Sequence, residues 1–88
     1  MSFDSSFGPI IRARLSDALV ERVLASIREG QLCVGERLPT IAEMARRFRV
    51  APATVREALV KLELMGIVDI RHGTGVTVRR QPPDGRAA

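Results

Sequence analysis

The chain of 88 residues has very little cysteine, histidine and aromatic side chain: one Cys, one His, three Phe, and neither Trp nor Tyr. The single Cys33 cannot close an internal disulfide, and with His72 it offers too few ligands for a zinc site. These shortages exclude a disulfide-stapled secreted domain and a structural zinc finger. They also disfavour a binder of single-stranded nucleic acid, because such proteins stack bases on aromatic side chains.

Long apolar runs are missing as well. No stretch approaches the ~18 apolar residues of a membrane-spanning helix, and residues 1–6 have neither the basic nor the apolar region of a signal peptide. One histidine and no pairing of a nucleophile with a base predict no catalysis, and we expect no cofactor in this chain. The expectation is one small cytoplasmic domain without a membrane partner.

The charge is distributed unevenly along the chain. Residues 1–45 carry five arginines against six acids, for a net charge of −1, whereas residues 46–80 carry eight basic residues against three acids, for a net charge of +5. Clustered arginine suggests a polyanion as partner, because the guanidinium fork matches phosphate oxygens. A merely solvated basic surface is the alternative, and charge alone does not decide between them.

The first half of the chain predicts one helix between irregular segments. Apolar residues recur every four positions from Leu15 to Ile27, which indicates an amphipathic helix over about 15–29, followed by Gly30 as its C-cap. Residues 1–13 contain Gly8-Pro9 and are expected to form a mobile N-terminal arm. Residues 81–88 contain two adjacent prolines and read as a linker or tail.

Two further helices and a hairpin follow. Thr40 and Glu43 have the spacing of a capping box that opens a helix ending near Phe48, and Pro52 suits the first position of a helix reaching Met65. Arg49 falls in the turn between them, where a left-handed conformation costs roughly 1 kcal/mol. Cys33 is expected to be a small buried hydrophobe.

Short strands are expected at 67–71 and 76–79, joined by a glycine-rich turn, with Arg37-Leu38 as a possible third strand. This order predicts a mainly α fold with a small β-hairpin, the winged helix-turn-helix: three helices plus a two- or three-stranded wing. The domain spans 14–80, with the helix-turn-helix at about 41–60 and the wing at about 67–79.

Three segments with fixed spacing resemble GntR-family bacterial transcription regulators. Residues 30–40 (GQLCVGERLPT) are similar to the stretch before the family's second helix. Residues 55–59 (VREAL), with Leu62 and residues 66–68 (GIV), are similar to its recognition helix and exit, and residues 72–78 (HGTGVTV) to its wing. The sequence of the wing favours the FadR-like branch of the family.

The resemblance implies an N-terminal winged-helix domain that binds double-stranded DNA, and a C-terminal domain that binds an effector and dimerises. The effector domain is absent from these 88 residues, so a small-molecule effector is expected only for that missing part. We expect a palindromic operator in the bacterial nucleoid, a homodimer on DNA, and a monomer or weak dimer in free solution. A winged helix used for protein contacts is the alternative, with Val60 and Leu64 on its outer side.

The resemblance implies DNA contacts at Arg56, His72 and Gly73, with an exposed loop histidine as the alternative for His72. The chemistry of other side chains adds further contacts, among which Arg46, Arg47 and Arg49 either position phosphates or are merely solvated. Arg56 is expected to reach DNA, with an ion pair to a neighbouring acid as the alternative. Thr54 either contacts a phosphate or thymine methyl or bonds its own backbone, and Glu57 is expected to pair with Lys61. The complete set of predicted DNA contacts is Thr40, Arg46, Arg47, Arg49, Ala53, Thr54, Arg56, Lys61, His72, Gly73, Thr74 and Arg79.

The chain departs from the family pattern at two places. Ala42 stands where the family usually has Arg inside the second helix. Ala51-Pro52 stands where it has Ser or Thr followed by Arg. The side chains that commonly contact bases or backbone at those positions are therefore missing, which puts the family's usual operator preference in doubt.

Overall fold

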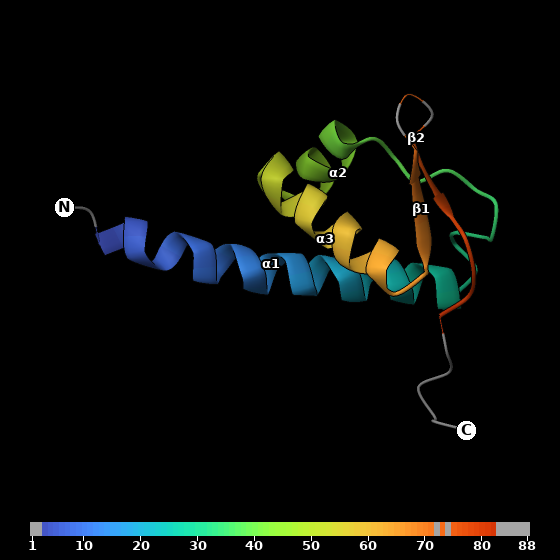
Figure 1. Cartoon of the computed structure of the whole chain (residues 1–88), viewed down its shortest axis with the longest axis horizontal. Helices are drawn as coiled ribbons and strands as arrows, with labels where there is room; N and C mark the ends of the chain where they lie inside the picture. The colour runs from blue at the N-terminus through green and yellow to red at the C-terminus, as the bar shows by residue number, and fades with distance from the viewer. Residues whose placement is uncertain (1–2, 72, 74, 83–88) are drawn as a thin grey trace, which may run out of the picture.

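A computed structural model describes residues 3–71, 73 and 75–82 of the chain. Its element order is α1 (Phe3–Arg28), α2 (Ile41–Phe48), α3 (Pro52–Leu64), β1 (Val68–Arg71) and β2 (Gly75–Val78). Figure 1 shows α1 as a long straight helix, with α2 and α3 packed on one side of it and the hairpin standing beyond the C-terminal half of α3. This arrangement confirms the predicted winged helix-turn-helix.

The helix α1 begins well before residue 15, where the sequence pattern placed its start, so most of the expected N-terminal arm is helical. It begins at Phe3 and continues through Pro9 for 26 residues in all. The sequence from Arg12 to Leu15 consists of good helix formers, which extend the helix toward the N-terminus, and Pro9 removes only one of its backbone hydrogen bonds. The first turns extend past the start of α3 (Figure 1), and Ile10 and Ile11 are exposed there.

The core joins all five elements. Leu19, Val23 and Ile27 of α1 are buried as their spacing predicts, but Leu15 is 41% exposed and Ser16 takes the buried place beside it. The remaining buried hydrophobic residues are Val20, Leu24, Leu38, Met44, Val55, Ala58, Leu59, Leu62, Ile67, Val68, Val76 and Val78. Because both strands of the hairpin contribute to this core, the wing has a fixed place relative to α3.

The turn between α2 and α3 follows the prediction. Thr40 caps α2, and both hydrogen bonds of the capping box with Glu43 are present. Arg49 adopts the left-handed conformation (φ 55°, ψ 48°) and donates its backbone N–H to the carbonyl of Ala45. The helix α3 begins at Pro52 after Ala51, which supplies no side-chain cap.

The end of α3 differs slightly from the prediction. The helix stops at Leu64, and Met65 is its C-cap and is 41% exposed rather than buried. Gly66 follows with a positive φ of 77°, which a residue with a Cβ adopts only at a cost. The chain then turns directly into the first strand of the wing.

The wing is an antiparallel pair of strands with a third segment at its edge. Val68 lies opposite Val78, and Ile70 opposite Val76. Arg37 forms an isolated bridge with Thr77, so the predicted third strand is present in its shortest form. The segment 35–38 is thereby fixed along β2, and it leads directly into the cap of α2.

Two further observations concern the described residues. Cys33 is exposed, in contrast to the buried position expected for it, because it lies in the loop between α1 and α2. Among residues 3–71, 73 and 75–82, no helix is long and apolar enough to cross a membrane.

Candidate nucleic-acid interface

The outer face of α3 is available for contact. Ala53, Arg56 and Val60 are exposed and lie three and four residues apart, so they form one stripe along the helix. The opposite face of α3 is held in the core by Val55 and Leu59. The predicted contacts Ala53 and Arg56 therefore point to solvent from the first half of the helix.

A shallow groove separates the start of α2 from the wing. Its volume is about 600 Å³, and Thr40, Ala42, Arg71 and Gly73 contribute to its lining. Arg46 is exposed one helical turn after Ala42 and lies on the same side of α2. The structure thus places two of the predicted contacts, Thr40 and Gly73, on one groove, with Arg46 further along the same side of α2.

Arg37 is a basic residue of this groove that sequence reasoning missed. Its side chain lies beside Gly75, the first residue of β2: a Cβ added to Gly75 would lie 3.4 Å from the Cδ of Arg37. Gly75 has a positive φ of 96°, a backbone conformation that a residue with a Cβ adopts only at a cost. The predicted pairing of 37–38 with the hairpin was the signal that could have identified Arg37.

The capping box fixes the start of α2 at the edge of this groove. Thr40 donates its backbone N–H to Glu43 Oε1 at 3.0 Å, and Glu43 donates its backbone N–H to Thr40 Oγ1 at 3.1 Å. The hydrogen bond from the Thr40 backbone N–H to the carboxylate, followed by the Thr40 side chain, holds the pKa of Glu43 below its usual range, with a smaller contribution from Arg47 and Arg46. Thr40 keeps an exposed position and is compatible with a contact to a phosphate.

One predicted contact is buried and another is bonded to α1. Thr54 is only 2% exposed, and DNA touches only atoms at the surface, so the predicted contact at Thr54 is withdrawn. Lys61 donates hydrogen bonds to Asp17 and Ser16 of α1, and its Nζ lies 3.6 Å from Glu57 Oε2. The predicted pair of Glu57 and Lys61 is confirmed, and the contact between Lys61 and DNA is corrected to a contact with α1.

Two further arginines lie away from the groove. Arg47 faces a small pocket between α1 and α2 that Arg22 and Phe48 also line, with the guanidinium of Arg22 at 5.7 Å from the Phe48 ring centroid. Arg79 lies at the base of the wing beside the end of α3, and its backbone N–H donates to the carbonyl of Ile67 at 2.7 Å. The structure therefore does not bring these two together with the contacts at the start of α3.

The remaining predicted contacts divide into two groups. Arg49 is exposed in the turn that precedes α3, where its side chain is free of the hydrophobic core. His72 and Thr74 lie outside the described residues. Thr40 and Gly73 line the groove together with Arg37 and Arg71, Arg46 is exposed on the same side of α2 as Ala42, and Ala53 and Arg56 are exposed on α3.

The fold and this surface define a winged-helix domain of the kind found in bacterial regulatory proteins. The profile described as "Bacterial regulatory proteins, gntR family" matches residues 15–78. The chain belongs to the GntR family. The resemblance inferred from the three sequence segments is thereby confirmed, and the FadR-like branch stays a prediction.

Two proteins that are similar in sequence to this chain are named as regulators. The chain is 46% identical over 69 residues to RmpR of Mycobacterium gastri, covering 76% of this chain and 25% of RmpR. It is 36% identical over 76 residues to the HTH-type transcriptional repressor NanR of Enterobacter sp. (strain 638), covering 86% of this chain and 29% of NanR. The chain thus spans between a quarter and a third of the length of these relatives. The family is one of transcriptional regulators and not of enzymes, as predicted.

The solved structures with the same fold include DNA complexes. The DNA-binding domain of AraR in complex with operator ORX1 superposes with a TM-score of 0.71 at 25% identity, covering 73% of this chain and 77% of that one. The transcriptional regulator YydK of Bacillus subtilis gives a TM-score of 0.71 at 27% identity, covering 81% of this chain and 31% of that one. The winged-helix architecture is therefore shared with domains that bind operators.

Proposed function

We propose that this domain binds double-stranded DNA in a sequence-specific manner through α3, the start of α2 and the wing. The observation that carries the proposal is a winged helix on which Arg56 is exposed on α3 while Thr40 and Gly73 line the groove between α2 and the wing. Arg56 lies on the exposed stripe of α3 that fits a major groove, and the arginines around the α2–wing groove suit the phosphates beside it.

The partner and its arrangement follow from the same geometry. We propose a palindromic operator on which two copies bind, each placing one α3 in a half-site, within the bacterial nucleoid of the cytoplasm. An effector-binding function belongs, in this proposal, to a part of a longer protein and not to residues 1–88. The share of the relatives that this chain spans supports that division of roles.

Duplex binding at several salt concentrations tests the proposal. The 88-residue chain is titrated against a 30-base-pair duplex chosen by selection from a random pool, and against an unselected duplex. If ~4–6 phosphates are neutralised, log K falls with log salt at a slope of roughly −4 to −5. A tighter complex with the selected duplex supports base reading. A flat salt response, or no duplex binding at low salt, overturns the DNA function and favours protein contacts through Val60 and Leu64, which are 49% and 83% exposed.

A further inference from the structure

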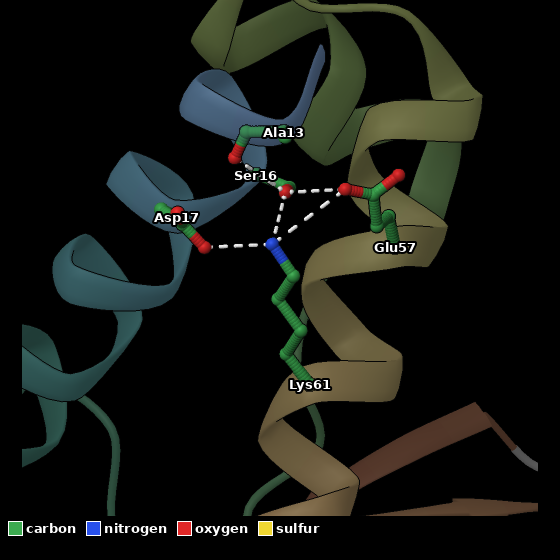
Figure 2. A network of polar contacts seen from close by, with 5 residues as sticks. All are labelled: Ala13, Ser16, Asp17, Glu57 and Lys61. Carbon is green, nitrogen blue, oxygen red and sulfur yellow. Dashed lines mark hydrogen bonds and ion pairs between the residues drawn. The ribbon is translucent and has the colours of Figure 1, made fainter. Parts of the chain in front are cut away.

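A polar network joins α3 to α1 behind the proposed DNA-binding surface. Figure 2 shows Ser16 and Asp17 of α1 facing Glu57 and Lys61 of α3. Lys61 Nζ lies 2.6 Å from Asp17 Oδ1 and 2.7 Å from Ser16 Oγ, and Ser16 Oγ lies 2.8 Å from Glu57 Oε2. Three of the four side chains thus meet at one hydroxyl, which is fully buried.

The hydroxyl of Ser16 connects a cation to an anion. It has one proton, and it accepts a hydrogen bond from Lys61 while that proton is directed to Glu57 Oε2 or to the carbonyl of Ala13 at 2.9 Å. Lys61 Nζ is also 3.6 Å from Glu57 Oε2, so the same ammonium group offsets the charge of Glu57 directly. The side chain of Glu57 is held toward α1 by both contacts.

Glu57 occupies a sensitive position on α3. It directly follows Arg56, the basic residue that points outward from the first half of that helix, and its own side chain is 37% exposed. If the Glu57 carboxylate left the network, it would become more exposed to solvent on the side of α3 near Arg56. There it would repel phosphates and compete with them for the guanidinium.

We propose, on the basis of the proposed DNA-binding function, that Lys61 and Ser16 are positioning residues that keep the Glu57 carboxylate against α1 and away from bound DNA. Their role in binding is then indirect. Lys61 contributes by neutralising and holding an acid on α3, and not by touching a phosphate. This assigns a use to a lysine that stands in the predicted set of DNA contacts.

A double-mutant cycle tests the role of Glu57. Lys61→Met should weaken binding of the selected 30-base-pair duplex about fivefold at low salt, on the order of one charge contact in water. Glu57→Gln should change the affinity of the parent chain less than about twofold, yet restore the Lys61→Met variant to within about twofold of the parent. Thermal unfolding of every variant sets a common measurement temperature at which all are folded.

Asp17 provides the matched control. Asp17→Asn in the Lys61→Met background removes the same charge from α1 instead of α3, so it should not restore binding. Should Lys61→Met fail to fold, Ser16→Ala replaces it in the cycle, with a smaller loss and the same rescue by Glu57→Gln expected. Equal rescue by Asp17→Asn and Glu57→Gln, or no rescue by either, overturns the proposal. If the parent chain binds no duplex, the DNA function itself fails, and the positioning role falls with it.

Discussion

At the scale of single residues, Arg49 is the clearest case of a local cost accepted by the fold. It is the one residue other than glycine with a positive φ among the described residues, at 55°. The left-handed conformation crowds the Cβ of an L-residue, and glycine removes that contact. An arginine at this turn therefore indicates either a use for its charge or simple tolerance of the strain.

Arg49→Gly is expected to stabilise the domain by about 0.5–1 kcal/mol, the relief of strain exceeding the entropy gained by the unfolded chain. Urea unfolding measures the change. Arg49→Ala is the control, because it removes the charge and keeps the Cβ. If Arg49 contacts a phosphate, both variants lose duplex affinity equally while only the glycine variant gains stability. A glycine variant less stable than the alanine variant would contradict the strain argument.

The residue scale is also where prediction from sequence was weakest. Thr54 and Lys61 lie in a helix whose existence was predicted correctly, but their direction depends on how α3 packs against α1. That packing is a tertiary property. The spacing of apolar residues within α3 does not predict which polar side chains of α1 will contact it. Arg37 was missed for the same reason, because its place beside Gly75 depends on the wing.

At the scale of elements, the capping box makes the start of α2 sensitive to acid. The hydrogen bonds from Thr40 lower the pKa of Glu43 relative to the unfolded chain. A lowered pKa in the folded state stabilises the fold above the pKa of unfolded Glu, and this contribution is lost as the pH falls through the folded value. Stability measured between neutral pH and about pH 3 should therefore contain a contribution from this one carboxylate.

Glu43→Gln isolates that contribution. The difference in unfolding free energy between the parent chain and the variant should be present at pH 6–7. It should shrink as the pH falls below the pKa of an ordinary Glu side chain, and disappear in strong acid. Chemical unfolding at each pH measures it. Thr40→Ala serves as a control, since it removes the helix cap at a cost of about 1 kcal/mol. A difference that grows on acidification would mean that Glu43 is not stabilised as a carboxylate.

Element boundaries were predictable wherever a local signal marks them. Thr40, Gly66 and Pro52 begin or end helices for reasons that act within a few residues, and the structure places α2 and α3 accordingly. The start of α1 was not predictable in the same way. Gly8-Pro9 favours an irregular arm, but the helix formers that follow it propagate the helix back to Phe3.

At the scale of the whole molecule, the exposed apolar residues are spread over separate places. Among the described side chains, Ile10, Ile11 and Leu15 lie in the first half of α1, Val34 lies in the loop after it, and Val60, Leu64 and Met65 lie on α3 and at its C-cap. Scattered apolar residues of this kind do not form the contiguous core of a stable dimer interface. The chain should therefore rely on DNA to bring two copies together.

Sedimentation without DNA is expected to give the 9.7 kDa monomer at micromolar concentration. On a palindromic duplex with half-sites one helical turn apart, two copies should bind, since each 13-residue α3 is about 20 Å long and fills only one half-site. Inserting about five base pairs between the half-sites turns the second copy to the opposite side of the duplex. Any affinity gained from contacts between the two bound copies should then disappear, while the affinity of each half-site for a single copy stays the same. A tight dimer in free solution would contradict this prediction and direct attention to Val60 and Leu64 as an interface between copies.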